Sequence, residues 1–215
     1  MPDLPSIVLV GLAGNTVELL ETIEAQYRVT AILSDNSDHA PDYRGTPVHP
    51  LDQAPRFADC AFLFLIGSET SFSRRRAMID ALGVAENRFA TLVDPRAIVS
   101  RLASLSPGTV LSSGVTLTAN AVLEPHVLVL PQTVIHHDVR IGRCSIVGSH
   151  VTIAGGVQIG TGCYIGSASA IRNGISIGDG ALIGLGANVV KDVPPGAVMV
   201  GNPARALPAR DAKTN

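Results

Sequence analysis

The chain has 215 residues, which is enough for one large domain or two modest domains with a buried core. Its 16 basic and 18 acidic residues give a formal net charge of -2, and no basic stripe is available to neutralise a phosphate backbone, so nucleic acid is not an expected partner. The N-terminus lacks the basic segment of a signal peptide, and no apolar run approaches the roughly 20 residues that cross a bilayer. We therefore expect no membrane span and a cytoplasmic location.

The cysteines indicate neither a disulfide framework nor a metal site. Cys60, Cys144 and Cys163 are odd in number and lack the C-x-x-C spacing of zinc ligands. We interpret them as small apolar residues in a reducing compartment and expect no bound metal.

Residues 1–90 alternate between strand and helix patterns. The apolar run 6–10 ends in a glycine turn, and residues 16–27 follow with helical spacing. Further strands are predicted at 28–33 and 60–66, and a further helix at 72–82. This alternation predicts a small α/β domain whose parallel sheet has a ligand crevice at the carboxyl ends of its strands.

Several residues at these carboxyl ends suit a nucleotide-linked ligand. The turn at Gly11, Gly14 and Asn15 opens a helix, where backbone N–H groups favour a phosphate. Its G-x-x-G pattern falls short of a dinucleotide fingerprint, so a nucleotide-sugar diphosphate fits better than NAD. Asp35 could accept from a hydroxyl or a base edge, although ordinary turn chemistry is the alternative for Asp35 and Ser68. The predicted substrate-binding residues are Gly11, Gly14, Asn15, Asp35, Asn36, Ile66, Gly67 and Ser68.

From Val99 onward the apolar period changes to six. The aliphatic positions are Val99, Leu105, Leu111, Leu117, Leu123, Val129, Ile135, Ile141, Val147, Ile153, Ile159, Ile165, Ile171, Ile177, Ile183 and Val189. Small or β-branched residues often stand four positions later, and glycine often follows directly, where we expect a corner to need backbone freedom. Such a hexapeptide repeat predicts a parallel β-helix, whose coils bury their faces by stacking on one another. We assign residues 91–215 to this all-β domain and its C-terminal tail.

Stacked coils of three hexads place residues 18 positions apart in columns. One column holds Ala119, His137, Gly155, Asn173 and Lys191, and the next holds Asn120, Asp138, Gly156, Gly174 and Asp192. In this geometry His126, His136, His137 and His150 all point outward, and we interpret His126 and His150 as plain surface residues. The glycines beside His137 predict an open groove of bare backbone, suited to an extended pantetheine arm.

The whole chain resembles the hexapeptide-repeat sugar acyltransferases of the sialic acid O-acetyltransferase and bacillosamine or perosamine N-acetyltransferase type. The resemblance rests on the glycine turn and on five further segments. These are Asp35-Asn36, residues 66–68, the motif His137-Asp138-x-x-Ile141-Gly142, residues 154–156 and the closing residues 201–205. It implies a Rossmann-like N-terminal domain and a left-handed β-helix. It also implies a homotrimer with acetyl-CoA held between adjacent subunits.

The chemistry of amide formation agrees with the resemblance on the catalytic residues. An amine that attacks a thioester needs a base for its proton, and an imidazole is largely neutral at physiological pH. We assign His137 as general base and Asp138 as the carboxylate that orients it, with His136 less favoured. The resemblance implies that the acetyl-CoA site includes Ile146, Gly148, Gly155, Gly156, Ser167, Gly174 and Leu185.

The leading hypothesis is acetyl-CoA-dependent N-acetylation of a nucleotide-linked amino sugar, presented across the domain junction to His137. O-acetylation of a sialic acid or a related sugar is the alternative within the same fold. A zinc lyase resembling the β-helical carbonic anhydrases would need histidines one coil apart, which positions 126, 136, 137 and 150 do not supply. A non-catalytic scaffold is the third alternative, but it leaves the glycines beside His137 unexplained.

Overall fold

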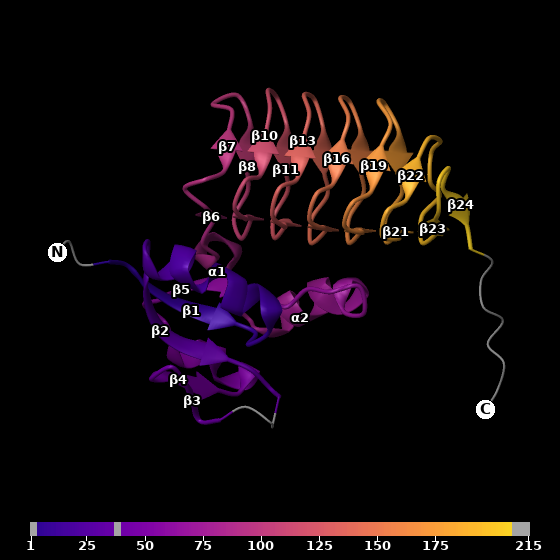
Figure 1. Cartoon of the computed structure of the whole chain (residues 1–215). Coiled ribbons are helices and arrows are strands. Elements are labelled where there is room, and N and C mark those ends of the chain that lie inside the picture. Colours follow the sequence, from indigo (N-terminus) through magenta and orange to yellow (C-terminus); the bar gives the residue numbers. More distant parts are fainter. Residues whose placement is uncertain (1–3, 37–39, 208–215) are drawn as a thin grey trace, which may run out of the picture.

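A computed structural model describes residues 4–36 and 40–207 (Figure 1). Residues 208–215, the end of the predicted tail, lie outside the described residues. The N-terminal domain is built on a five-stranded sheet of order β3-β4-β2-β1-β5. Its strands are β1 (Ser6–Val10), β2 (Arg28–Leu33), β3 (Asp42–Tyr43), β4 (Thr46–His49) and β5 (Ala61–Phe64). All neighbours run parallel except the β3 and β4 pair, so the prediction of a parallel sheet is confirmed. Strands β3 and β4 were not predicted, because Pro47 interrupts the apolar pattern there.

Two helices cover opposite faces of this sheet. Helix α1 (Gly14–Glu24) packs over Ile7 and Leu9, while α2 (Arg75–Ala81) packs over Val8 and Val10, as the alternation of a strand requires. Short 3-10 helices lie at η1 (Leu51–Arg56), η2 (Phe72–Arg74) and η3 (Glu86–Arg88). Within the described part of the chain, no helix is both long enough and apolar enough to span a bilayer.

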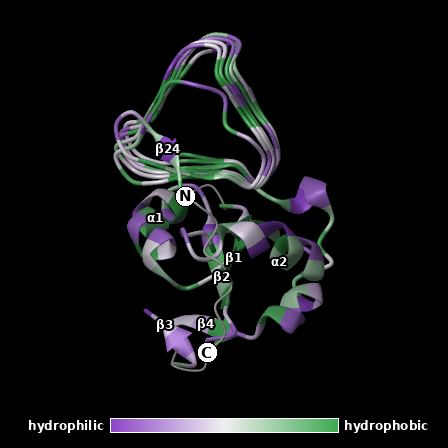
Figure 2. Cartoon of the chain, turned by 90° about the vertical axis from the view of Figure 1, so that its right-hand side faces the viewer, coloured by the Kyte–Doolittle hydropathy of each residue, from purple (hydrophilic) through white to green (hydrophobic). Residues whose placement is uncertain are grey.

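The rest of the chain forms a left-handed parallel β-helix of triangular cross-section (Figure 2). We call its eight-stranded side the docking face, and the other two sides face two and face three. The docking face comprises β6 (Leu92–Val93), β9 (Val110–Leu111), β12 (Leu128–Val129), β15 (Ile146–Val147), β18 (Tyr164–Ile165), β21 (Leu182–Ile183), β23 (Val198–Val200) and β24 (Arg205–Ala206). Face two comprises β7 (Ile98–Val99), β10 (Thr116–Leu117), β13 (Val134–Ile135), β16 (Thr152–Ile153), β19 (Ala170–Ile171) and β22 (Asn188–Val189). Face three comprises β8 (Ser104–Leu105), β11 (Val122–Leu123), β14 (Arg140–Ile141), β17 (Gln158–Ile159) and β20 (Ser176–Ile177).

The aliphatic residues that recur every six positions from Val99 to Val189, which we call the aliphatic ladder, point into the prism, as predicted. Its members from Leu111 to Val189 are all buried, and only Val99 and Leu105 in the first coil are partly exposed. Strand pairs join residues 18 positions apart, for example Thr116 with Val134, so the predicted register is confirmed.

Glycines often follow directly after a ladder residue, and the prediction that they supply backbone freedom at a corner is wrong. Gly142 and its equivalents do not adopt positive φ; a Cβ on Gly142 would lie 2.5 Å from the backbone of Gly160, so these glycines let neighbouring coils approach closely. The left-handed conformation falls instead three residues after each aliphatic ladder position from Leu105 to Ile183. The described residues in this position are Gly108, Gly114, Asn120, His126, Gln132, Asp138, Cys144, His150, Gly156, Gly162, Ala168, Gly174, Gly180 and Gly186. Asn and Asp are among the residues that tolerate this conformation best after glycine.

The N-terminal domain packs on the docking face beneath the first coils, and the later coils extend past it (Figure 1). The apolar core between its sheet and α1 continues directly into Val110, Leu128 and Ile146, which lie on the outside of the docking face. This contact buries apolar surface on both domains, which stabilises their arrangement.

The interpretation of His126 as a plain surface histidine is wrong. It points out of the prism as predicted, but the N-terminal domain covers it and leaves it 1 % exposed. Its ring meets Phe89 edge-on with 4.6 Å between centroids, and its carbonyl accepts a 3.0 Å hydrogen bond from buried Arg75. Burial, with the charges of Arg75 and Arg143, lowers the pKa of His126 to about 4, so this ring is neutral at physiological pH.

A buried carboxylate joins α1 to the first coil. Asp94 accepts a 2.6 Å hydrogen bond from the Thr22 hydroxyl and further bonds from the backbone and guanidinium of Arg96. These bonds, foremost those from Arg96, hold the pKa of Asp94 well below its usual range. A carboxyl group with a depressed folded-state pKa stabilises the fold above its unfolded pKa of about 3.9.

We expect Asp94→Asn to lower the free energy of unfolding by about 1.5–3 kcal/mol at neutral pH, the range for hydrogen bonds to charged groups. The difference from wild type should shrink as the pH falls below about 3.9, because acid protonates Asp94 in the unfolded wild-type chain first. Urea unfolding at pH 7 and pH 3, at one protein concentration, measures both effects. A destabilisation that is equal at both pH values would contradict the assigned role of the charge.

Candidate active site

His137 and Asp138 occupy the prism edge between faces two and three, which we call the outer edge. They form the corner between β13 and β14, and both side chains are exposed. His137 Nδ1 lies 2.8 Å from Asp138 Oδ2, so Nδ1–H can donate a hydrogen bond to the carboxylate, which leaves Nε2 unprotonated and able to take a proton. The hydrogen bond with His137, followed by one from Asn120, lowers the pKa of Asp138 and keeps it ionised. This arrangement suits a general base with a fixed tautomer.

The ring of His137 lies over the next coil of the same edge. A Cβ on Gly155 would lie 2.5 Å from His137 Nε2, so the ring occupies the space that a side chain at position 155 would need. Around the neighbouring Gly156 and Gly174 the surface stays open, because a Cβ on Gly156 would find its nearest neighbour at 4.0 Å and one on Gly174 would find none within that distance. His137 Nε2 therefore lies over a strip of bare backbone, in the register that the columns predicted.

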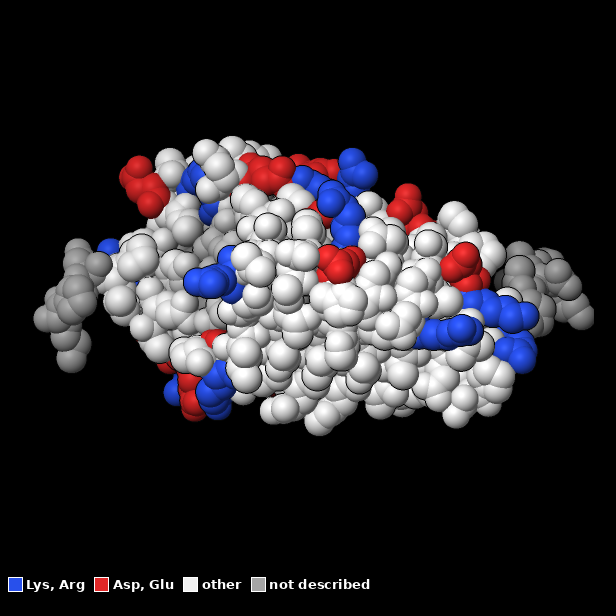
Figure 3. All heavy atoms as spheres, turned by 90° about the horizontal axis from the view of Figure 1, so that it is seen from above, with Lys and Arg blue, Asp and Glu red and all other residues white. Residues whose placement is uncertain are grey.

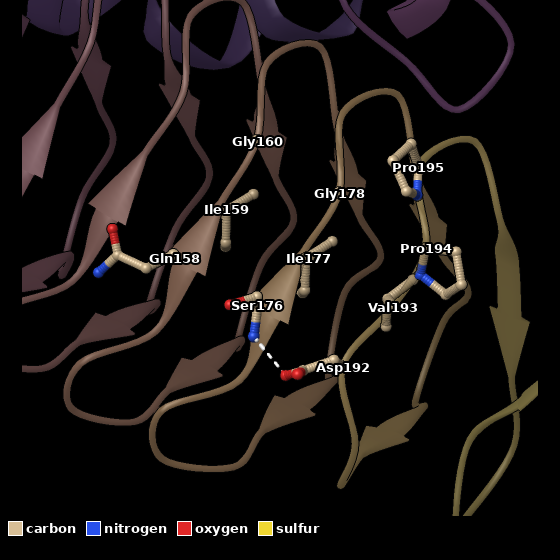
Figure 4. Close-up of a pocket in the computed structure, with 10 residues that line it drawn as sticks. All are labelled: Gln158, Ile159, Gly160, Ser176, Ile177, Gly178, Asp192, Val193, Pro194 and Pro195. Atoms are coloured by element: carbon tan, nitrogen blue, oxygen red, sulfur yellow. Dashed lines mark hydrogen bonds between the residues drawn. The ribbon is translucent and has the colours of Figure 1, made fainter.

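A groove of about 500 Å³ lies on face three beside this strip (Figure 4). Gln158 stands at its start and donates to the carbonyl oxygens of Asp138, at 3.4 Å, and Gly156, at 3.3 Å. Asp192 lies farther along and accepts a 2.8 Å hydrogen bond from the backbone N–H of Ser176. The other lining residues are Ile159, Gly160, Ile177, Gly178, Val193, Pro194 and Pro195. Gln158 thus connects the groove to the backbone carbonyl of Asp138.

The outer edge is opposite the docking face, and this contradicts the expectation that a substrate crosses the domain junction to His137. In a triangular prism the corner between faces two and three is the one that the docking face does not touch. In the part of the chain that the structure describes, the core of the N-terminal domain packs against the docking face and its corners (Figure 2). Within one chain, therefore, the nucleotide-binding candidates and His137 lie on opposite sides of the β-helix.

The predicted substrate-binding residues separate into two groups. Gly11, Asn15 and residues 66–68 meet where β1 and β5 end, and the Asn15 side chain donates to the carbonyl oxygens of Leu65 and Gly67 at 2.9 and 3.0 Å. Gly14 is the first residue of α1. Asp35 and Asn36 line a separate pocket of about 320 Å³ with His49. Asp35 Oδ1 accepts from the backbone N–H of Leu51 at 2.8 Å, so one of its oxygens is used in turn chemistry.

The predicted acetyl-CoA residues also separate. Gly155, Gly156 and Gly174 lie on the outer edge with His137, whereas Gly148, Ser167 and Leu185 lie on the edge between the docking face and face two. Ile146, the remaining predicted acetyl-CoA residue, differs from both groups. Ile146 is 1 % exposed because it packs beneath Gly67 of the N-terminal domain, and so its side chain has no free surface for a ligand.

Two residues that contact the pair were not predicted as site residues. Asn120 donates a 3.0 Å hydrogen bond to Asp138 Oδ1, and Gln158 bonds the Asp138 carbonyl. The spacing of 18 residues between Asn120 and Asp138 could have indicated the first contact, since both are in one column. In residues 4–36 and 40–207, no group of three or more His, Cys, Asp or Glu is arranged to hold a metal ion.

The repeat and the fold define the class of protein that this chain is similar to. Residues 120–155 match the family model described as bacterial transferase hexapeptide (six repeats). No curated protein sequence gives a significant match.

Three solved structures share the fold over almost the full length of the chain. The acetyltransferase domain of PglB from Neisseria gonorrhoeae in complex with acetyl coenzyme A is 24% identical, with a TM-score of 0.83 over 95% of this chain and 100% of that chain. PerB from Caulobacter crescentus in complex with CoA and GDP-perosamine is 22% identical, with a TM-score of 0.81 over 94% of this chain and 97% of that chain. WeeI from Acinetobacter baumannii is 24% identical, with a TM-score of 0.78 over 94% of this chain and 99% of that chain. These likenesses establish the two-domain fold.

Proposed function

We propose that this protein is an acetyl-CoA-dependent N-acetyltransferase that acts on the amino group of a nucleotide-linked amino sugar. The observation that carries the proposal is the His137-Asp138 pair, which holds a free imidazole nitrogen over bare backbone and is linked through Gln158 to the neighbouring groove. The similar structures support the choice of ligands, because PglB is described with acetyl coenzyme A and PerB with CoA and GDP-perosamine. We also propose a cytoplasmic location, in keeping with three free cysteine thiols.

In the proposed reaction, the sugar amine attacks the thioester carbonyl and a C–N bond forms as the C–S bond breaks. His137 Nε2 takes the proton that the amine loses, and Asp138 stabilises the imidazolium through Nδ1. The proton then passes to the departing thiolate, so the products are the N-acetyl sugar and free CoA. The glycines of the outer edge leave backbone N–H and C=O groups open to a pantetheine arm.

A substrate screen tests this function directly. UDP-, GDP- and dTDP-linked amino sugars are each incubated with acetyl-CoA, and the release of free thiol is followed. We expect turnover that needs an amine on the sugar, and the matched hydroxyl-bearing sugars should be inert. Turnover of the hydroxyl acceptors alone would identify an O-acetyltransferase, and no turnover of either class would contradict the proposal.

A complete site needs a second copy of the chain. Face two carries uncharged residues at its outward strand positions, which are Ile98, Thr116, Val134, Thr152, Ala170 and Asn188. Seen from above the prism, large areas of the β-helix carry no charged side chain (Figure 3). The two groups of predicted acetyl-CoA residues border this same face on its two edges. Copies related by a threefold axis would set one edge of each prism against the other edge of its neighbour and bring the neighbour's N-terminal domain towards His137.

We therefore expect a homotrimer in solution. Sedimentation equilibrium at the concentration used for assays measures the mass directly, against 22.3 kDa for one chain. An active monomer would contradict both the trimer and the placement of the acetyl-CoA site between subunits.

The two ligands should depend on different domains. We expect Asp35→Ala to lower kcat/KM for the nucleotide sugar by about 10-fold or more while the affinity for acetyl-CoA stays unchanged, since energy from binding the remote nucleotide positions the amine. Acceptor kinetics and acetyl-CoA binding by calorimetry, measured separately, check this. If acetyl-CoA affinity collapses while the acceptor constants hold, the two sites are assigned the wrong way round.

A further inference from the structure

Asp138 is held from two sides. Its Oδ2 meets His137 Nδ1 at 2.8 Å, and its Oδ1 accepts a 3.0 Å hydrogen bond from the Asn120 side-chain amide one coil earlier. The amide, the carboxylate and the imidazole thus form a continuous chain along the outer edge, which ends at Nε2 above Gly155.

The exposure of these groups makes the second contact important. The side chains of His137 and Asp138 are 62% and 57% exposed, so packing does little to hold the carboxylate in place. A carboxylate bonded at one oxygen can rotate and exchange its partner for water, whereas one bonded at both oxygens has a fixed plane. Asn120 is neutral and donates, so it favours the ionised carboxylate without competing for the Nδ1 proton.

We propose that Asn120 is a positioning residue, which fixes the Asp138 carboxylate so that His137 presents Nε2 to the acceptor amine. Its effect on turnover rests on the proposed function, but its coupling to the imidazole does not. Asn120 touches no reacting atom and acts only through Asp138.

The backbone at this position allows a clean deletion of the side chain. Asn120 has a φ of 59°, a left-handed conformation that glycine adopts without strain. Asn120→Gly therefore removes the amide and leaves the corner intact. Arg44→Gly is the control for the backbone change, because Arg44 is an exposed residue with a φ of 54° in the turn between β3 and β4 of the N-terminal domain.

We expect Asn120→Gly to lower kcat by about tenfold through misorientation of the base, with the KM for acetyl-CoA changed less than about twofold. Arg44→Gly should keep wild-type constants. Equal losses in the two variants, or a loss that is confined to KM, would mean that Asn120 only supports the backbone at its corner. Either result would overturn the proposal.

A second measurement needs no substrate. Asn120→Asp puts a negative charge beside the pair, which favours the imidazolium. We expect the midpoint of the His137 ring titration, followed by NMR and assigned with His137→Ala, to rise by about half a pH unit or more. The acidic limb of the kcat/KM profile should move the same way. An unchanged midpoint would overturn the coupling, whereas a raised midpoint in a protein that acetylates no sugar would contradict only the proposed function.

Discussion

Replacing His137 with alanine should lower turnover by about 10²–10⁴-fold, the range for loss of a general base. The side chain is exposed at a prism corner and packs against no core residue, so the free energy of unfolding should change by less than about 0.5 kcal/mol. Thiol release under saturating substrates measures the first effect, and urea unfolding measures the second.

His136→Ala is the matched control for this variant. His136 is the adjacent imidazole, and its loss should leave turnover within a few-fold of wild type. Near-normal turnover of His137→Ala would remove His137 from the mechanism, and a loss in His136→Ala alone would move the base to position 136.

Placing a methyl group at Gly155 should lower kcat by about 100-fold, because the new Cβ would lie 2.5 Å from His137 Nε2 and displace the ring from the groove. Gly155 does not have a positive φ, and the group in its way is the free end of an exposed side chain. We therefore expect Gly155→Ala to fold normally and to lose activity. Single-turnover kinetics separate this loss from an effect on acetyl-CoA binding.

The double variant shows whether Gly155 acts through the imidazole. In a His137→Ala background the ring is already absent, so Gly155→Ala should cause no further loss of kcat, and the two effects should be strongly non-additive. Additive losses would mean that the methyl group acts on something else, such as the bound thioester.

Because the β-helix repeats the same unit along one axis, most of its geometry can be predicted from the sequence. Each hexad repeats the same corner and each coil stacks on the next, so the register of 18 residues follows from the spacing of the aliphatic ladder. That register was sufficient to place His137 over Gly155 and Asp138 beside it. It also put Asn120 in line with Asp138, although the hydrogen bond between them depends on side-chain conformations that the register does not specify.

The burial of His126 and Ile146 was not predicted, because it depends on which prism face the N-terminal domain covers. A residue that points outward from a β-helix is exposed or buried according to what packs on that face, and the hexad pattern is the same on all three. His126 and Ile146 are both outward, and both are buried because the N-terminal domain lies on the docking face.

The periodic spacing of the chain was enough to specify the change from an α/β domain to a β-helix, the inward ladder and the column that sets His137 beside Gly155, because each depends on contacts that recur at fixed intervals. The tertiary contacts between the domains settled which side of the prism stays open. They cover the docking face through Val110, Leu128 and Ile146 and leave the outer edge with His137 exposed on the opposite side. Which face is covered depends on apolar contacts between residues far apart in the chain, and a six-residue repeat that is the same on all three faces cannot predict it.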